Sequence, residues 1–168
     1  MWSARSVSPI PVVAAGGIAD GRGLAAALVL GAQGVNMGTR FLASQEATIP
    51  DEWKQAIVSA QSEDAVKVEV WQDIFPEAAT VGFGTVPRAL RTPFIQEWQG
   101  KREDAKREAE RLQAQVGAAF QQGRMHEIVP FTGQSAGLVR EVLPVAEIVR
   151  ALLSEAEQTL DSVVGLKA

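Results

Sequence analysis

Two short apolar runs, each followed by a glycine turn, constrain the fold of this chain more than any other feature of its sequence. Residues 10–15 are followed by Gly16 and Gly17, and residues 34–37 are followed by Gly38. Continuous apolar runs of this length are typical of strands that are covered on both faces of a parallel sheet. We therefore expect a strand covered on both faces over residues 10–15 and a second short strand over residues 34–37, parallel to it and ending in a similar turn.

One helix is predicted between the two strands. Asp20 is a good N-cap residue, Leu24 and Leu28 lie at helical spacing, and Gly31 is a typical helix stop. Strand, helix and strand in this order form a βαβ unit with a right-handed crossover. The expected fold class is α/β.

The rest of the chain predicts a hairpin and then helices. Residues 66–70 alternate between apolar and charged, which favours a half-buried strand, and Thr92 followed by Pro93 favours a helix start. The remaining expected elements are a helix over 51–58, a loop over 71–84, a second hairpin arm over 85–90, a long helix over 101–121, a loop over 130–137 and an apolar helix from 145.

A chain of 168 residues has room for one domain with its own core. We divide it into a βαβα unit over residues 10–60, a hairpin and loop arm over 61–92 and a helical part over 93–168. The four tryptophans are scattered, and we expect them to pack in cores rather than to stack on a ligand.

Composition excludes several classes of function. The net charge of −4 gives no electrostatic footprint for nucleic acid or an anionic membrane. The chain has no cysteine and a single histidine, so we expect neither a disulfide framework nor a metal site. No signal-peptide pattern and no apolar run of roughly 20 residues is present, so we expect a cytoplasmic protein.

The two glycine turns are the best candidates for chemistry. Glycine allows a tight turn and lets backbone N–H groups approach an anion without a Cβ in the way. A helix N-terminus behind such a turn adds a favourable dipole. Neighbouring turns at the carboxyl ends of parallel strands could therefore hold a phosphate group. The residues alone leave two interpretations open, a phosphate site and ordinary turns.

Three segments resemble one known family. Residues 11–42, PVVAAGGIADGRGLAAALVLGAQGVNMGTRFL, are similar to the segment of the nitronate monooxygenase (2-nitropropane dioxygenase-like) family that carries the last two strands of its barrel. Residues 88–94, RALRTPF, resemble the segment before the family's long helix. Residues 133–139, GQSAGLV, resemble its closing loop near the flavin.

The resemblance implies an FMN-dependent oxidoreductase with a TIM (β/α)₈ barrel. In the family, backbone amides of the two turns hold the FMN phosphate, which assigns that role here to Gly16, Gly17, Met37, Gly38 and Thr39. Asn36 stands where the family usually has Gln. This difference affects a side-chain contact to the cofactor, whereas the backbone contacts to the phosphate are unaffected. Gln134 and Ser135 match the late loop and are candidates for lining the flavin.

The resemblance covers only part of a barrel, which takes about 250 residues when complete. We therefore interpret the chain as a partial barrel, its last two strand–helix units, followed by a hairpin-like arm and C-terminal helices. Unpaired strand edges and uncovered helix faces follow from that interpretation. We expect a chain that is poorly stable alone, self-associates, or needs a complementing N-terminal barrel half.

The implied activity is the oxidation of alkyl nitronates, small-molecule substrates, with FMN and dioxygen. No catalytic residue is assigned, because the family's catalytic histidine belongs to earlier strands and His126 matches none of its motifs. Two alternatives remain. One is an FMN-dependent enoyl-acyl-carrier-protein reductase, which shares the barrel and similar turns, and the other is a non-catalytic truncated remnant.

Overall fold

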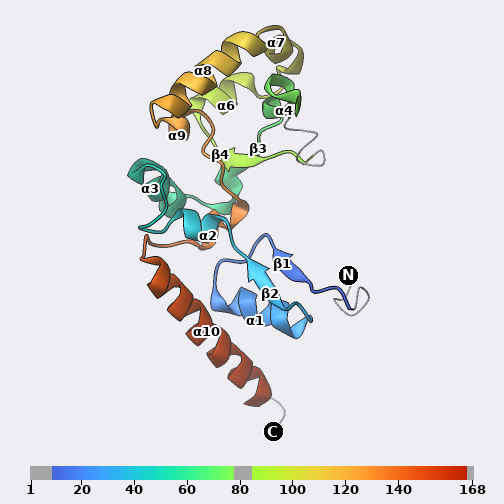
Figure 1. The fold of residues 1–168 in the computed structure, drawn as a ribbon, viewed down its shortest axis with the longest axis vertical. Helices are drawn as coiled ribbons and strands as arrows, with labels where there is room; N and C mark the ends of the chain where they lie inside the picture. The colour runs from blue at the N-terminus through green and yellow to red at the C-terminus, as the bar shows by residue number, and fades with distance from the viewer. Residues whose placement is uncertain (1–8, 78–84, 166–168) are drawn as a thin grey trace.

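The computed structural model describes residues 9–77 and 85–165 of an elongated molecule (Figure 1). Its elements, in chain order, are β1 (Val13–Ala15), α1 (Gly21–Val29), β2 (Gly34–Asn36), α2 (Thr39–Leu42), α3 (Asp51–Ser59), the 3₁₀ helix η2 (Ser62–Asp64), β3 (Ala65–Lys67), α4 (Val70–Ile74), β4 (Arg88–Leu90), α6 (Pro93–Trp98), α7 (Arg102–Arg107), α8 (Ala109–Gln121), α9 (Met125–Ile128), the 3₁₀ helix η3 (Gln134–Leu138) and α10 (Val145–Gly165).

The predicted strand–helix–strand unit is present at one end of the molecule. β1 and β2 pair in parallel, and α1 connects them. The Asp20 carboxylate accepts a hydrogen bond of 2.8 Å from the Gly23 N–H and caps α1, as predicted. After the helix, Gly31 adopts a φ of 97°, a left-handed conformation that glycine adopts without strain.

The expectation that β1 is covered on both faces is wrong. β1 pairs only with β2 in the described part of the chain, and the side chain of Val13 is 57% exposed. Val12 and Ala14 point to the opposite face, which α1 covers only in part, and both are half-buried. The strand is also shorter than the apolar run that predicted it.

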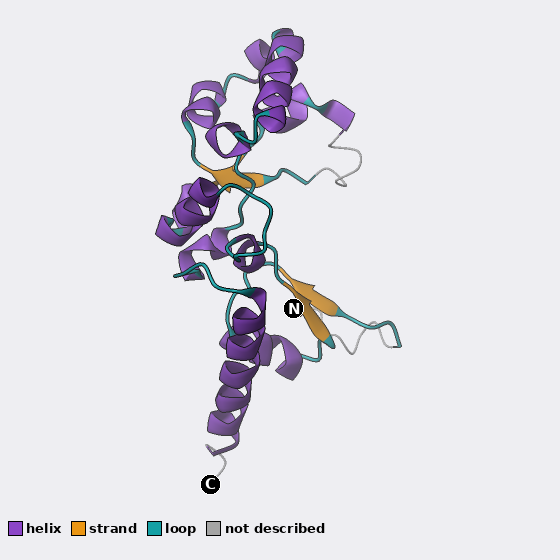
Figure 2. Ribbon diagram, turned by 60° about the vertical axis from the view of Figure 1, so that its left-hand side comes forward, coloured by secondary structure: helices purple, strands orange, loops and turns teal. Residues whose placement is uncertain are grey.

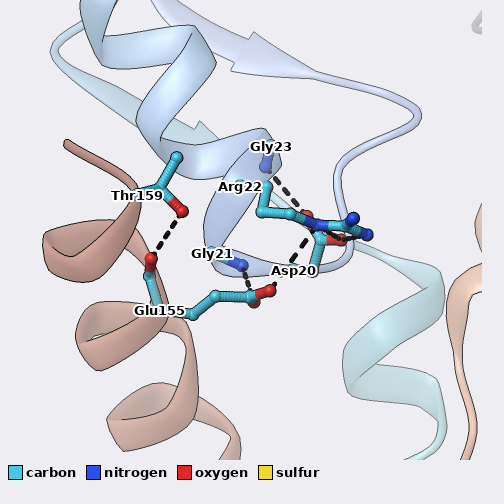
Figure 3. Close-up of polar contacts among 6 residues, drawn as sticks. All are labelled: Asp20, Gly21, Arg22, Gly23, Glu155 and Thr159. Carbon is cyan, nitrogen blue, oxygen red and sulfur yellow. Dashed lines mark hydrogen bonds and ion pairs between the residues drawn. The ribbon is translucent and has the colours of Figure 1, made fainter. Parts of the chain in front are cut away.

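The long C-terminal helix α10 packs against α1 (Figure 3). The helices approach closely at Gly21, whose N–H donates a 2.7 Å hydrogen bond to Glu155 Oε2. A Cβ on Gly21 would lie 2.5 Å from the Cβ of Glu155 and 2.6 Å from the carbonyl oxygen of Leu152. Only glycine therefore fits at this contact.

The other end of the molecule is a helical lobe on a short antiparallel hairpin. The predicted hairpin is confirmed, with Val66 of β3 opposite Ala89 of β4. Figure 2 shows the two strand pairs as separate sheets, with helices between them. Thr92 caps α6 by accepting a hydrogen bond from the Ile95 N–H, and Pro93 occupies the first helical turn, as predicted.

Two elements of the lobe differ from the prediction. Residues 70–74, where a loop was expected from residue 71, form α4; residues 78–84 lie outside the described residues. The long helix expected over 101–121 is two helices, because Glu108 leaves helical geometry with a φ of −102° and a ψ of 14°. The break turns α7 so that it buries Ala105 against the core while α8 buries Leu112.

Two apolar clusters form the core. One lies within the helical lobe and includes Ile74, Trp98 and Leu112. The other lies around α3 and η3 and includes Trp53 and Val139. Trp53 and Trp98 therefore pack in cores, as expected, whereas Trp2 lies outside the described residues.

None of the helices within residues 9–77 and 85–165 is long and apolar enough to cross a membrane. The division into parts over residues 10–60, 61–92 and 93–168 stays a prediction. α10, in the part over residues 93–168, contacts α1, in the part over residues 10–60.

The contact at Gly21 predicts the effect of adding one methyl group. We expect Gly21→Ala to lower the free energy of unfolding by roughly 1–3 kcal/mol, because the new Cβ overlaps the backbone of α10. Gly117→Ala in α8 is the matched control, since a Cβ there meets no atom within 4 Å. The free energy of unfolding of this control should rise by roughly 0.5–1 kcal/mol. Urea denaturation measures the free energy of unfolding of both variants, and equal changes in the two would contradict the packing described at Gly21.

Candidate functional site

The register of the parallel pair brings the two predicted turns to one edge. Ala15, the last residue of β1, lies opposite Asn36, the last residue of β2. Neighbouring strands lie about 4.8 Å apart. Gly16 and Gly17 therefore leave the sheet beside Met37 and Gly38.

The first turn requires glycine for its backbone conformation. Gly16 has a φ of 89° and Gly17 a φ of 73°, both in the left-handed region that other residues rarely adopt. A Cβ at either position would meet no atom within 4 Å, and both residues are exposed. The turn thus presents open backbone to solvent.

The second turn leads directly into α2. Gly38 is the residue before the helix, and its carbonyl oxygen accepts hydrogen bonds from the N–H groups of Phe41 and Leu42. The first N–H groups of a helix have no acceptor within it. Asn36 and Gly38 are exposed and Met37 is half-buried. A polar ligand can therefore reach the backbone of this turn.

A hydrogen bond across 94 residues brings the late loop to the second turn. The Gly133 N–H donates to Thr39 Oγ1 at 3.0 Å, and Thr39 is buried. Gln134, which is exposed, and Ser135, which is half-buried, follow at the start of η3. The predicted residues of the second turn and of the late loop are therefore neighbours in space.

Arg40 holds α2 against the segment that follows η3. Its side chain is only 7% exposed, and one terminal nitrogen donates to the carbonyl oxygens of Ala43 at 3.1 Å and Glu141 at 2.9 Å. Burial lowers the pKa of Arg40, and the nearby Glu141 carboxylate partly offsets that effect. The sequence alone did not predict this role of Arg40.

Further bonds extend the same contact. The Gln45 N–H donates to the Leu143 carbonyl at 3.0 Å, and the Val145 N–H donates to the Glu46 carboxylate at 2.9 Å. No local sequence signal could have revealed these pairs, because about a hundred residues separate their members. They fix the start of α10 relative to α2.

Asp20 is a structural residue at the rim of the first turn. Burial acts to raise the pKa of its carboxyl group, but hydrogen bonds from the Gly23 N–H and the Arg22 side chain outweigh burial and lower the pKa. Arg22 contacts Asp20 at 2.7 Å and Glu155 at 3.6 Å (Figure 3). The carboxylate is therefore stabilised in its ionised form as a helix cap.

His126 lies apart from the glycine turns. It belongs to α9 and lines a hollow formed with α6, to which neither turn contributes. Its Nδ1 atom is buried without a hydrogen-bond partner. Within the described residues, no three His, Cys, Asp or Glu side chains are grouped so that they could hold a metal ion.

Comparison with protein families identifies relatives of this chain. The family model for nitronate monooxygenase matches residues 1–155. The nitronate monooxygenase npaC of Metarhizium robertsii is 39% identical over 164 residues, which are 94% of this chain and 44% of that protein. A probable nitronate monooxygenase of Staphylococcus aureus is 40% identical over 91 residues, 54% of this chain and 22% of that protein.

Two solved structures share the fold. FabK from Thermotoga maritima matches with a TM-score of 0.77 and 39% identity over 96% of this chain and 49% of that one. The nitroalkane oxidase of Streptomyces ansochromogenes matches with a TM-score of 0.70 and 27% identity over 95% of this chain and 43% of that one. The predicted fold class, an α/β chain forming part of a TIM barrel, is confirmed, and the chain spans less than half of each relative.

Asp20 predicts a specific pH dependence. Because its pKa in the folded protein lies below the ordinary value of 3.8, its ionised form stabilises the fold above that value, and this contribution is lost as the pH falls through the lowered pKa. Asp20→Asn keeps a good N-cap without a titrating group. We expect the wild type to exceed this variant in free energy of unfolding at pH 7, and the difference to shrink below about pH 5. Urea denaturation at a series of pH values measures this difference in the free energy of unfolding. A difference that stays the same at every pH would contradict a stabilising role for the ionised Asp20 carboxylate.

Proposed function

The chain belongs to the nitronate monooxygenase family, and we propose from this premise that it carries the FMN phosphate-binding part of a flavin-dependent oxidoreductase that oxidises alkyl nitronates with dioxygen. The observation that carries the proposal is the register of β1 and β2. It sets two glycine turns side by side at one edge of the sheet.

The residues present fit a phosphate dianion. Gly16, Gly17 and Gly38 lack side chains that would cover the backbone, and a Cβ direction at each is open. Met37 and Thr39 complete the second turn at the start of α2. Backbone N–H groups and a helix start favour bound anions. We assign these five residues to the phosphate group of FMN.

Asn36, Gln134 and Ser135 are proposed to contact other parts of the cofactor. Asn36 ends β2 at the edge where the turns lie. The Gly133 N–H is already bonded to Thr39, so the late loop would contribute its side chains rather than this amide. Arg40 would act through α2, because its guanidinium group bonds to carbonyl oxygens of the chain itself.

FMN, when bound, would supply the redox chemistry in which the nitronate is oxidised and dioxygen is reduced. The residues described here would bind and orient the cofactor, and we assign none of them as the catalytic base. Because the chain spans less than half of its relatives, we propose that catalysis requires the complementing barrel half.

Phosphate recognition predicts a preference between two flavins. We expect the chain to bind FMN at least tenfold more tightly than riboflavin, since the two ligands differ only by the phosphate group that the turns would hold. Quenching of flavin fluorescence measures both affinities. Equal affinities would refute the phosphate assignment, and no binding of either flavin, with or without the complementing half, would favour the non-catalytic remnant.

Gly17→Ala should weaken FMN binding at least tenfold and leave riboflavin binding nearly unchanged. The alanine is strained at a φ of 73°, and its methyl group would lie beside the proposed phosphate amides. Gly100→Ala is the matched control, because Gly100 has a φ of 78° and open space around it in the turn before α7. If both variants lose FMN affinity equally, the loss reflects stability and not the site.

The reaction itself is tested with the chain mixed with the unmatched part of the Metarhizium robertsii relative. Oxygen consumption with a nitronate as substrate would support the proposed activity. Oxidation of NADPH by an enoyl thioester, without oxygen consumption on nitronates, would support the reductase alternative instead.

A further inference from the structure

The late loop leaves the helical lobe from a segment that pairs with β4. Phe131 forms an antiparallel bridge with Ala89, and the Thr132 N–H donates to the Arg88 carbonyl at 3.0 Å. β4 therefore holds the chain as far as Thr132. Gly133 is the next residue and begins the late loop. The contacts of these last two residues set the direction in which the loop enters the candidate site.

Thr132 and Gly133 are bonded to two different helices. The indole N–H of Trp53, in α3, donates to Thr132 Oγ1 at 3.1 Å across 79 residues of sequence. The Gly133 N–H donates to Thr39 Oγ1, in α2, at 3.0 Å. Two adjacent residues thus connect the start of the late loop to both helices that follow the second glycine turn.

The hydrogen bond between Trp53 and Thr132 is buried. Trp53 is 8% exposed and Thr132 is 3% exposed. Phenylalanine would fill much of the same space in the core, but it lacks the N–H donor, which needs a partner when it is buried. Because water cannot easily reach the bond, loss of the donor would leave the Thr132 oxygen without it. The indole therefore constrains the position of Thr132 in addition to filling the core.

The far end of the late loop is held by a close contact with η2. A Cβ on Gly137 would lie 2.4 Å from Ser62 Oγ and 2.8 Å from the Ser62 backbone nitrogen. Gln134 is exposed and Ser135 is half-buried, and both lie between this contact and the bonded pair at the start of the loop. Their positions therefore depend on both ends.

We propose that Trp53 is a positioning residue for the cofactor. By holding Thr132, it fixes the late loop in the position from which the side chains of Gln134 and Ser135 meet the flavin. The identity of the ligand rests on the proposed function, whereas the position of the loop rests on the buried hydrogen bond. Trp53 itself would touch no atom of the cofactor and would act through Thr132.

Amide hydrogen exchange on the full 168-residue chain tests the position of the loop without any flavin. Trp53→Phe keeps a buried ring and removes the N–H, so we expect the Gly133 amide to exchange at least tenfold faster than in the wild type. The Gly23 amide, which caps α1, is the reference and should be unchanged. Trp98→Phe is the matched control, since Trp98 is 6% exposed and belongs to the cluster of the helical lobe.

Two results of this experiment would overturn the proposal. One is an equal increase in exchange at the Gly133 and Gly23 amides, which would show global unfolding. The other is the same increase at Gly133 in the Trp53→Phe and Trp98→Phe variants, which would show that any loss of core packing releases the loop.

The acceptor of the bond provides a second set of variants. Thr132→Val removes the oxygen and should reproduce the exchange of Trp53→Phe, whereas Thr132→Ser keeps the oxygen and should exchange like the wild type. The double variant of Trp53→Phe and Thr132→Val should exchange no faster than either single variant, because both remove the same bond. Additive effects, or wild-type exchange in Thr132→Val, would overturn the proposal.

Flavin binding tests what the position of the loop does for the cofactor. We expect Trp53→Phe to weaken FMN and riboflavin by the same factor, about tenfold, since the loop would contact parts that the two ligands share. Gly17→Ala, in contrast, should weaken only FMN. The absorption spectrum of the bound flavin should shift in Trp53→Phe and not in Trp98→Phe, because a loss of stability alone changes the bound fraction and not the spectrum.

These outcomes distinguish a failure of this proposal from a failure of the proposed function. If FMN binds more tightly than riboflavin but the bound flavin has the same spectrum in both tryptophan variants, the proposed function stands and the role of Trp53 is overturned. If neither flavin binds to the wild type, with or without the complementing half, the proposed function is overturned, and the role of Trp53 toward the cofactor with it.

Discussion

The hydrogen bonds of α2 to the segment 133–145 hold the candidate site together. Thr39 accepts from Gly133, and Arg40 donates to the carbonyl of Glu141, so two adjacent residues of one short helix fasten a distant part of the chain. A four-residue helix has little stability of its own. Its position therefore depends on these contacts, and the second glycine turn, which precedes it, depends on them too.

The parallel register adds the other half of the geometry. Because Ala15 and Asn36 lie opposite each other at the strand ends, the turns after them share one edge of the sheet. The close packing of Gly21 on α10 then fixes α1 behind the first turn. The site is thus assembled from three chain segments, which are positioned by hydrogen bonds between side chains and backbone groups.

Local signals in the sequence were sufficient to predict the βαβ unit. Asp20, Gly31 and the two glycine turns each determine the conformation of only the few residues around them. The same holds for the start of α6 at Thr92. The kink at Glu108 and the helix α4 could not be predicted, since both depend on packing within the helical lobe. The role of Arg40 was also missed, because its partner Glu141 lies 101 residues away. Family resemblance supplied the proposal that the ligand is FMN, which periodicity cannot give.

The two-stranded sheet of β1 and β2 has a consequence for how copies of this chain could associate. Each strand pairs on one side only within the described residues, so the sheet has two different outer edges. If the β1 edge of one copy pairs with the β2 edge of the next, an unpaired strand edge remains at each end of the assembly. Such a head-to-tail assembly closes into a ring only if the rotation between successive copies allows it, and otherwise it continues as a filament.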